Sequence, residues 1–390
     1  MGQPGESLVR VAILGQHPND PQRLLGGVQA AIAYVLPELA MLPDLELRVI
    51  ACSEGLSETR RTTVAGVPVT FLPRKGLGRV TWHLREVRAM LREMEGYAPD
   101  LVHAHGAGLY AGAAIASGRP AVVTVHGIFG QEARLLRGWR ARLRGELDGL
   151  YERWVLSRCQ HLITISPYVE RVFSGVFHGQ TYLVENPVDP RFFDLERRPV
   201  QGRMLLPAVV IPRKGVMPAI KAVERLIDSQ PDVHLRVAGS LHSRPDYAAR
   251  CQEYVDHRGL AERVTFLGHL DQETLLEEYA TCELLLLPAF QETAPISLEQ
   301  GMAAGVPCVA TRVGGVGDMI RDGESGYTLP ASPAPDGDPE ALASACERVL
   351  SDPEGAQRAG AQAKIEAEVR FRASRVAQAT ADVYRQVLGS

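Results

Sequence analysis

A polar loop between a predicted strand and a predicted helix holds the residues with the clearest chemical meaning. After the apolar run 283–287, which predicts a strand, come Gln291, Glu292 and Thr293. Pro295 then stands where the next helix should begin. Free backbone N–H groups in the first turn of a helix favour anions. We therefore expect this loop to hold a phosphate or diphosphate, with Glu292 accepting hydrogen bonds from ligand hydroxyl groups.

A cationic candidate lies in the segment 211–215 (IPRKG), which ends the predicted strand 204–211 and opens the predicted helix 215–227. Lys214 would meet a diphosphate as a point charge, and Arg213 would add a guanidinium fork. The flanking proline and glycine at a strand end favour a binding role over an ordinary surface lysine.

Two further segments carry candidate residues in the first half of the chain. His126, followed by a glycine, comes directly after the apolar run 121–125, which favours a place in a site. Gly26 and Gly27 precede the predicted helix 28–39. Glycines there let a backbone approach a ligand closely, although a plain turn explains them equally well.

The stretch 284–326 (LLLLPAFQETAPISLEQGMAAGVPCVATRVGGVGDMIRDGESG) resembles the donor-site signature of glycosyltransferase family four, a GT-B family of retaining enzymes. In that family two glutamates stand eight positions apart, ahead of an A-x-G-x-P helix end and a G-G turn. Glu292 matches the first glutamate, whereas Gln300 stands at the second and Glu299 one residue early. Because an amide both donates and accepts, Gln300 or Glu299 could still hold a ribose diol.

The resemblance implies transfer of a hexosyl group from a UDP- or GDP-sugar to a hydroxyl acceptor, with retention at the anomeric carbon, in cell-surface glycan or glycolipid synthesis. It places His126, of a T-x-H-G element, beside the transferred sugar, and Lys214 in the family's phosphate clamp, whose arginine position falls on Val209. The implied donor-binding positions are Gly26, Gly27, Arg213, Lys214, Glu292, Thr293, Ala294, Pro295, Ile296, Glu299 and Gln300. Of these, Lys214 and Glu292 are also expected to be catalytic, together with His126.

Neither of two metal-like patterns predicts a metal site. His103 and His105 alternate to one face of a predicted strand, but no third ligand stands at a suitable spacing. Asp336 and Asp338 spell the D-x-D of metal-dependent sugar transferases, yet Asp338 directly precedes Pro339 and is better explained as a helix N-cap. We expect no metal and no cofactor other than the nucleotide sugar, so cations and helix N-termini must meet the leaving-group charge.

Alternation of short apolar runs with helical patterns predicts parallel sheets covered by helices in both halves of the chain. The predicted strands are 9–14, 47–51, 101–105, 121–125, 161–165, 204–211, 233–238, 264–267, 283–287 and 306–310. We predict an α/β, GT-B fold of two Rossmann-like doubly wound domains that face a central cleft. The predicted parts are an N-terminal acceptor-binding domain (1–190), a linker (186–202), a C-terminal nucleotide-sugar-binding domain (203–370) and a C-terminal helix (371–390) that packs back on the first domain.

Composition agrees with two domains and limits the partners. At 390 residues and 45% hydrophobic content, the chain can fill two cores. The formal charge is +2 over residues 1–190 and −6 over the remainder, so nucleic acid is not an expected partner. No apolar run approaches a membrane span or secretory signal, and the six cysteines form no C-x-x-C pair. These features predict a cytoplasmic protein with reduced thiols.

Basic residues gather in two stretches of the first half. The first contains Arg74, Lys75, Arg79, Arg85, Arg88 and Arg92. The second, a predicted helix over 132–158, interleaves Arg134, Arg137, Arg140, Arg142 and Arg144 with Leu135, Leu136, Trp139 and Leu143. Such helices can rest on anionic lipid at the inner membrane face. The alternative is a solvated arginine face above an ordinary core stripe.

Two other functions share this architecture. A sugar-nucleotide 2-epimerase has two similar domains but needs no acceptor, and the basic first half argues mildly against it. A donor-binding protein with weak or no catalysis would explain the departures at Val209 and Gln300. Neither alternative is excluded by the residues alone.

Overall fold

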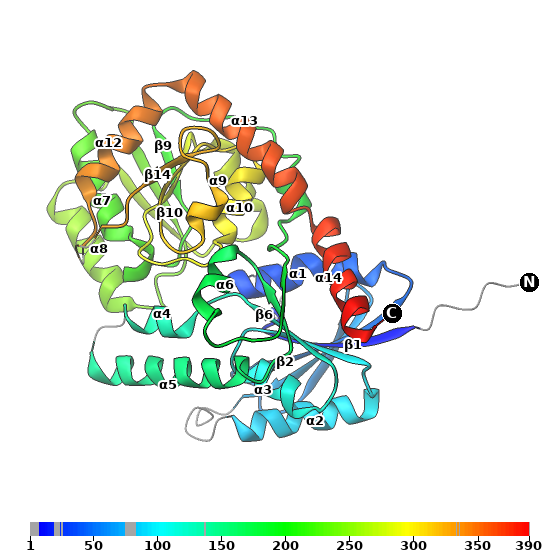
Figure 1. The fold of residues 1–390 in the computed structure, drawn as a ribbon. Helices are drawn as coiled ribbons and strands as arrows, with labels where there is room; N and C mark the ends of the chain where they lie inside the picture. Colours follow the sequence, from blue (N-terminus) through cyan, green and yellow to red (C-terminus); the bar gives the residue numbers. More distant parts are fainter. Residues whose placement is uncertain are drawn as a thin grey trace, which may run out of the picture. The chain divides into compact units, whose positions relative to one another are not determined.

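The computed structural model describes residues 8–18, 24, 26–74, 83–135, 138–332, 334 and 336–389. It divides the chain into two compact units (Figure 1). Unit 1 comprises Met1–Pro187 and Ala373–Ser390, and unit 2 comprises Val188–Arg372. Among the basic-stretch residues predicted from the sequence, Lys75, Arg79, Leu136 and Arg137 lie outside the described residues.

Unit 1 is built on a sheet whose described strands follow the order β3-β4-β2-β1-β5-β6-β7-β8. Neighbouring strands are parallel except β3 and β4, which pair antiparallel. The strands are β1 (Val9–Leu14), β2 (Leu45–Ser53), β3 (Arg60–Val64), β4 (Val67–Pro73), β5 (Leu101–His105), β6 (Ala121–Val125), β7 (His161–Thr164) and β8 (Gln180–Leu183). The helices are α1 (Gly27–Ala40), α2 (Leu84–Tyr97), α3 (Leu109–Ala116), α4 (Phe129–Ala133), α5 (Trp139–Leu156), α6 (Pro167–Phe173) and α14 (Ala373–Leu388).

Unit 2 has an all-parallel sheet whose described strands follow the order β11-β10-β9-β12-β13-β14. The strands are β9 (Arg203–Leu206), β10 (His234–Ala238), β11 (Val264–Gly268), β12 (Leu284–Leu287), β13 (Cys308–Thr311) and β14 (Tyr327–Leu329). The α-helices are α7 (Val216–Leu226), α8 (Pro245–His257), α9 (Gln272–Thr281), α10 (Ile296–Ala303), α11 (Val316–Met319), α12 (Pro339–Leu350) and α13 (Pro353–Arg370), and two 3₁₀ turns are η1 (Pro190–Phe192) and η2 (Pro212–Lys214). The order reverses between β9 and β12, which is the doubly wound arrangement that the sequence predicted.

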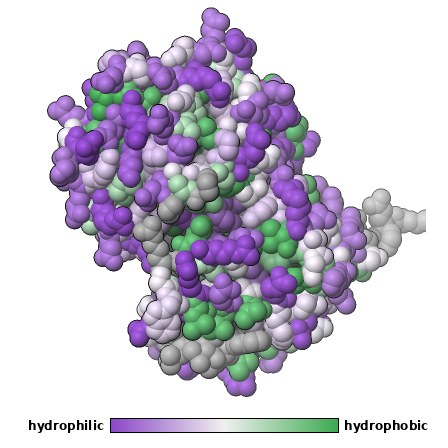
Figure 2. Space-filling model, turned by 60° about the vertical axis from the view of Figure 1, so that its left-hand side comes forward, coloured by the Kyte–Doolittle hydropathy of each residue, from purple (hydrophilic) through white to green (hydrophobic). Residues whose placement is uncertain are grey.

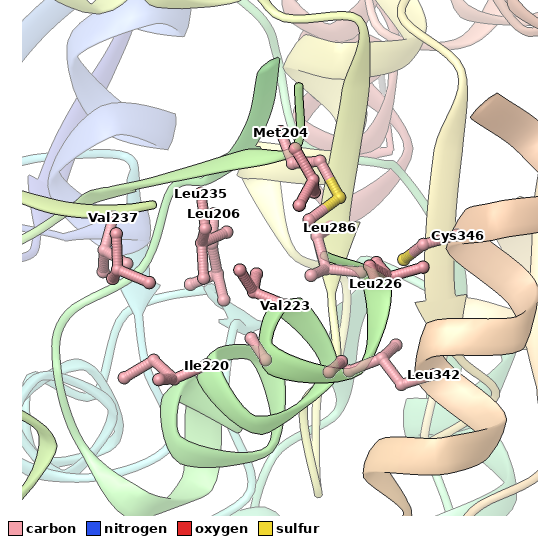
Figure 3. Close-up of a cluster of buried hydrophobic side chains, with 14 of the residues drawn as sticks. Met204, Leu206, Ile220, Val223, Leu226, Leu235, Val237, Leu286, Leu342 and Cys346 are labelled. Carbon is pink, nitrogen blue, oxygen red and sulfur yellow. The ribbon is translucent and has the colours of Figure 1, made fainter. Parts of the chain in front are cut away.

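Buried strands in unit 2 carry apolar residues on both faces because helices cover both faces. In β12, Leu284 and Leu286 join one core cluster, and Leu285 and Leu287 join the other. Figure 3 shows the first cluster, in which Ile220, Val223 and Leu226 of α7 lie against strand side chains such as Leu206, Leu235 and Leu286. The four leucines of β12 therefore pack into the cores on both faces of the sheet. This packing fixes the end of β12, from which the next loop starts.

Helix α14 belongs to unit 1, although it follows unit 2 in the sequence. It packs beside α1, and its buried Val376, Ala377 and Tyr384 join the core of the unit 1 sheet (Figure 1). Arg385 of α14 forms an ion pair with Asp44 at 2.7 Å. Hydrophobic burial and this ion pair together fix the helix against the first half of the chain.

Several boundaries differ from those predicted. Strand β9 ends at Leu206 rather than at position 211, because the chain turns at Pro207 and continues as a loop into η2. The predicted helix 132–158 is two helices, α4 and α5, and α5 begins after Gly138 at φ 90°. The strands β3, β4, β8 and β14 were not predicted. Within the described residues, no helix combines the length and apolarity that a membrane span requires.

Candidate active site

The reversal of strand order in unit 2 brings the two predicted phosphate-contacting loops together. Strands β9 and β12 pair through Leu284 with Met204 and Leu285 with Leu205. The loop after β9 carries Lys214, and the loop after β12 carries Glu292. In doubly wound sheets, ligands bind beyond the carboxyl ends of the strands at such a reversal. The topology therefore puts both loops where a ligand is expected.

Glu292 lies between two cations. Its Oε1 is 2.5 Å from Lys214 Nζ, and its Oε2 is 3.7 Å from Arg213 Nη1. The Glu292 side chain is only 7% exposed, so these contacts are poorly screened by water. Arg213 Nη1 also donates to the Gln291 carbonyl oxygen at 3.0 Å. One carboxylate thus holds in place the two cations that the sequence assigned to a diphosphate.

Gly215 allows the two loops to approach this closely. Its φ of +70° lies in the left-handed region, and a Cβ at this position would lie 1.9 Å from the Pro288 carbonyl oxygen. Next to it, Phe290 N donates to the Arg213 carbonyl oxygen at 2.8 Å. The backbone of η2 is therefore hydrogen-bonded to the loop after β12 and in close contact with it, and these contacts set the position of Lys214.

The N-terminus of α10 follows this loop as predicted. Pro295 is its N-cap residue, with φ −74° and ψ 115°, and the helix runs from Ile296. Thr293 is buried, and the Glu292 carbonyl oxygen accepts a hydrogen bond from Gly315 N at 3.2 Å. The turn before α11 therefore braces the peptide that leads into the helix, and the first N–H groups of α10 are close in sequence to the paired carboxylate.

Gln300 and Glu299 lie farther along α10 and are both buried. Gln300 is 5% exposed and its Oε1 lies 3.2 Å from the Tyr279 hydroxyl, whereas Glu299 is 0% exposed. A ligand hydroxyl can reach a side chain only through its accessible surface. This difference favours Gln300 over Glu299 as the ribose contact, which stays a prediction.

In unit 1, the candidate His126 stands at the end of β6 in a group of three imidazoles. Its Nδ1 lies 3.2 Å from Asn186 Oδ1, and its Nε2 lies 2.9 Å from His105 Nδ1. Because an amide oxygen only accepts, the His126 proton lies on Nδ1 and Nε2 accepts from His105. His103 completes the group, with its ring tilted 36° from that of His105 and the two ring centroids 4.2 Å apart.

Burial keeps these imidazoles neutral. It lowers the pKa of His103 to about 3 and that of His126 to about 4, and it lowers the pKa of His105 well below its ordinary value. His103 forms hydrogen bonds with the Tyr384 hydroxyl and Thr124 Oγ1, each at 2.7 Å. His126 is therefore a neutral, oriented side chain at neutral pH rather than a cation.

These shifts predict an acid-sensitive unit 1. The unfolded chain takes up protons below the ordinary histidine pKa of about 6.5, and the folded imidazoles do not until far lower pH. The stabilisation is therefore fully present above about pH 6.5 and is lost as the pH falls toward about 3. Each histidine contributes a slope of about 1.4 kcal/mol per pH unit to the free energy of unfolding. Glu152 of the same unit acts in the opposite direction, because burial raises the pKa of its carboxyl to about 7, so it offsets the share of one histidine. Urea unfolding at about pH 7.5 and about pH 5 should show the net loss.

His103→Gln is the matched variant for that measurement. It removes one titrating group while keeping polar atoms opposite Tyr384 and Thr124. The slope of the unfolding free energy against pH, measured below about pH 6.5, should therefore decrease by about 1.4 kcal/mol per pH unit. An unchanged slope would contradict the assignment of acid sensitivity to this group.

Gly26 and Gly27 stand at the start of α1 as predicted. Gly27 is the first helical residue, and Gly26 has φ 176°, extended backbone that any residue can adopt. Among the described residues, a Cβ at Gly26 would meet no atom within 4 Å. The described neighbours therefore do not require glycine at position 26, and its role in donor binding stays a prediction.

The two metal-like patterns have structural partners. Asp338 caps α12, and its Oδ1 accepts from Ala341 N at 3.0 Å, which confirms the N-cap prediction. His103 and His105 take part in the hydrogen bonds given above. Over the part of the chain that the structure describes, no three His, Cys, Asp or Glu side chains form a group that could hold a metal ion.

Some supporting residues were not predicted from the sequence. Glu152 of α5 is 1% exposed and accepts hydrogen bonds from Phe129 N at 3.1 Å and Gly130 N at 3.4 Å, just after His126 in the chain. Burial raises the pKa of the Glu152 carboxyl to about 7. Glu152 could have been found from the sequence, because helical spacing places it on the same face of α5 as Gly145 and Gly149. The sequence around Asn186 contains no comparable indication of its role.

Comparison with known proteins gives matches over both halves of the chain. A family model described as Glycosyltransferase Family 4 matches residues 25–192, and one described as Glycosyl transferases group 1 matches residues 192–366. A glycogen synthase from Mycobacterium tuberculosis is 30% identical over 328 residues, which cover 79% of this chain and 76% of the relative.

Solved structures agree on the fold. Sucrose-phosphate synthase from Thermosynechococcus elongatus has a TM-score of 0.83 and 21% identity, covering 98% of this chain and 99% of its own. The Anabaena protein Alr3699/HepE, solved with UDP and glucose, has a TM-score of 0.75 and 19% identity, covering 97% of this chain and 100% of its own. At these identities the likeness concerns the fold alone.

Proposed function

The chain belongs to glycosyltransferase family 4, and from this premise we propose that it moves a hexosyl group from a UDP- or GDP-sugar to a hydroxyl acceptor of a cell-surface glycan or glycolipid. Family membership makes it a GT-B enzyme, a retaining hexosyltransferase with a nucleotide-sugar donor, as the sequence predicted. The observation that carries the finer proposal is the Lys214, Arg213 and Glu292 group at the reversal of strand order in unit 2.

In this proposal, unit 2 holds the donor. Lys214, Arg213 and the first N–H groups of α10 stabilise the charge that develops on the departing diphosphate. Glu292 accepts hydrogen bonds from the sugar hydroxyls. Since Lys214 Nζ has three donors, it can serve a phosphate oxygen and Glu292 at the same time. The charge of the leaving group is thus met by side chains and backbone of this chain, without a metal.

Unit 1 supplies the acceptor side. His126 lines it as a neutral imidazole whose tautomer is set by Asn186 and His105. No described residue lies within 4 Å of a Cβ placed at Gly26, and a glycine there suits the close approach of a ligand. The departing phosphate then helps to deprotonate the acceptor hydroxyl as the new bond forms on the same face of the sugar. We place the protein in the cytoplasm, with peripheral contact to the inner membrane face.

A thermal-shift screen followed by product analysis tests the proposal. UDP, GDP, ADP and their sugars are added to the protein, and the nucleotide of the true donor should raise the melting temperature. A ligand at about 100 times its Kd stabilises the folded state by about 2.7 kcal/mol. The matching sugar nucleotide is then incubated with glycan and lipid-linked acceptors, and nuclear magnetic resonance should show that the product keeps the anomeric configuration of the donor.

Two outcomes would contradict the proposal. Isomerised sugar nucleotide formed without any acceptor would favour an epimerase. Donor binding without hydrolysis or transfer over a broad acceptor panel would favour a binding protein.

A further inference from the structure

The outer face of α5 is apolar and exposed. Trp139, Leu143, Leu147, Leu150 and Trp154 follow one another at intervals of three or four residues, so they form a single stripe along the helix. Their exposed fractions run from 37% for Trp154 to 70% for Trp139. The stripe spans nearly the whole length of the helix.

The stripe is not the core-facing side of α5. The opposite face carries Gly145 and Gly149, and a Cβ at Gly149 would lie 3.0 Å from Gly130 Cα. Together with the buried Val155 and Leu156, these glycines pack α5 closely onto its own unit. The core-stripe alternative for Trp139 and Leu143 is therefore wrong, and the helix has a second apolar face that nothing in the described chain covers.

Arginines border the stripe on both sides. At 100° per residue, Arg142 and Arg153 lie along one edge, and Arg140 and Arg144 lie along the other. All four are exposed, and Arg158 beyond the helix end lies over the Trp154 ring, with its guanidinium carbon 4.3 Å from the centroid. In Figure 2, in which the side with α5 in Figure 1 comes forward, hydrophobic side chains gather in a patch between hydrophilic ones.

We propose that this outer face of α5 inserts into the interfacial region of an anionic lipid bilayer. Tryptophans near both ends of the stripe suit the boundary between headgroups and acyl chains, and the leucines between them enter it. Arginines on both edges extend their charged groups to anionic headgroups. A helix of 18 residues is about 27 Å long, and its exposed stripe would lie flat in the membrane plane.

Charge favours a lipid surface over a protein partner as the occupant. The stripe itself contains no charged residue, and arginines outnumber the acidic side chains of α5 that lie at its edges. Arg140, Arg142 and Arg144 flank the first half of the stripe and Arg153 flanks its last part, and these four outweigh Glu146, the acidic residue at its edge. This border suits a sheet of negative headgroups. The inference deepens the proposed contact with the inner leaflet and rests on that part of the proposed function. Sugar transfer to soluble acceptors is measured separately from vesicle binding, so a failure of one proposal can be told from a failure of the other.

Vesicle sedimentation with the full chain tests the inference. The probes are phosphatidylcholine vesicles with and without phosphatidylglycerol. Leu147→Gln/Leu150→Gln should weaken binding to the anionic vesicles at least about tenfold, since the inserted apolar area is lost. Arg140→Gln/Arg144→Gln should weaken it too and reduce its salt dependence. Tryptophan fluorescence of the unsubstituted protein should shift to shorter wavelength with anionic vesicles.

The matched control is Ile365→Gln/Val369→Gln, which removes an equally exposed apolar pair from α13 in unit 2. It should leave vesicle binding unchanged. All variants should keep the circular dichroism spectrum and the thermal shift with nucleotide, which separates this test from that of donor binding. Equal binding by the Leu147→Gln/Leu150→Gln variant, or no binding by any form, would overturn the inference. So would a dimer in solution that the same variant abolishes, because a second copy would then cover the stripe.

Discussion

Glu292→Gln should lower the rate of sugar transfer by about 10²- to 10³-fold while the protein stays folded. The substitution removes a charged acceptor that is expected to grip the transferred sugar, and losses of this size follow when one preorganised electrostatic contact is removed. Glu292→Ala should abolish transfer. Initial rates with the donor identified by thermal shift measure the effect, and circular dichroism checks the fold.

The same variant should separate binding from catalysis. In Glu292→Gln, Lys214 and Arg213 lose the carboxylate that neutralises them, so their attraction for a diphosphate increases. The Kd for the nucleoside diphosphate, measured by calorimetry, should therefore stay equal or fall while turnover collapses. Glu277→Gln is the control, because Glu277 forms an exposed ion pair with Arg198 in the same unit. Near-normal turnover in Glu292→Gln would remove Glu292 from the catalytic group.

Gly215→Ala should destabilise unit 2 by about 2–4 kcal/mol and abolish donor binding. The added Cβ meets the Pro288 carbonyl oxygen at 1.9 Å, so the backbone of η2 or of the loop after β12 must move. That movement separates Lys214 from Glu292. Urea unfolding measures the loss of stability, and the nucleotide-induced rise in melting temperature measures donor binding.

Gly259→Ala controls for backbone conformation. Gly259 has nearly the same φ, +67°, but a Cβ there would meet no atom of the described residues within 4 Å. Its substitution should cost only about 1 kcal/mol, the strain of a side chain in the left-handed region, and should leave donor binding intact. If Gly215→Ala behaved like this control, the close approach of the two loops would not be what positions Lys214.

Buried parallel strands were predictable because most of their residues are apolar and helical patterns separate them in the sequence. Strands β1, β5 and β6 have the predicted bounds, and the predictions for β10, β11 and β12 are within one residue. The edge strand β3 (RRTTV) was not predictable in the same way, since four of its five residues are exposed and its pairing with β4 depends on the sheet already being present. Strand β9 was predicted too long because Val209, Val210 and Ile211 are apolar in a loop.

More of the arrangement around Glu292 in unit 2 could be predicted from the sequence than of the arrangement around His126 in unit 1. Glu292 and Lys214 stand at the ends of two strands, so the doubly wound order alone brings them to neighbouring loops. The partners of His126 come from β5 and from the chain after β8, and their hydrogen bonds depend on how imidazole rings stack. Sequence spacing carries no information about that stacking. The close approach of Gly215 to Pro288 could not be predicted either, because it depends on backbone distances of a few tenths of an ångström.

Helix α14 has a consequence for synthesis on the ribosome. The sheet of unit 1 is translated first, but the side chains of Val376, Ala377 and Tyr384 that complete its core are translated only after all of unit 2. Until then, the face of α1 and β5 that α14 covers is open to water, and His103 lacks its Tyr384 partner. Unit 2 can therefore mature while the earlier unit is still unfinished, and a stalled or truncated chain would present that uncovered face to chaperones and proteases.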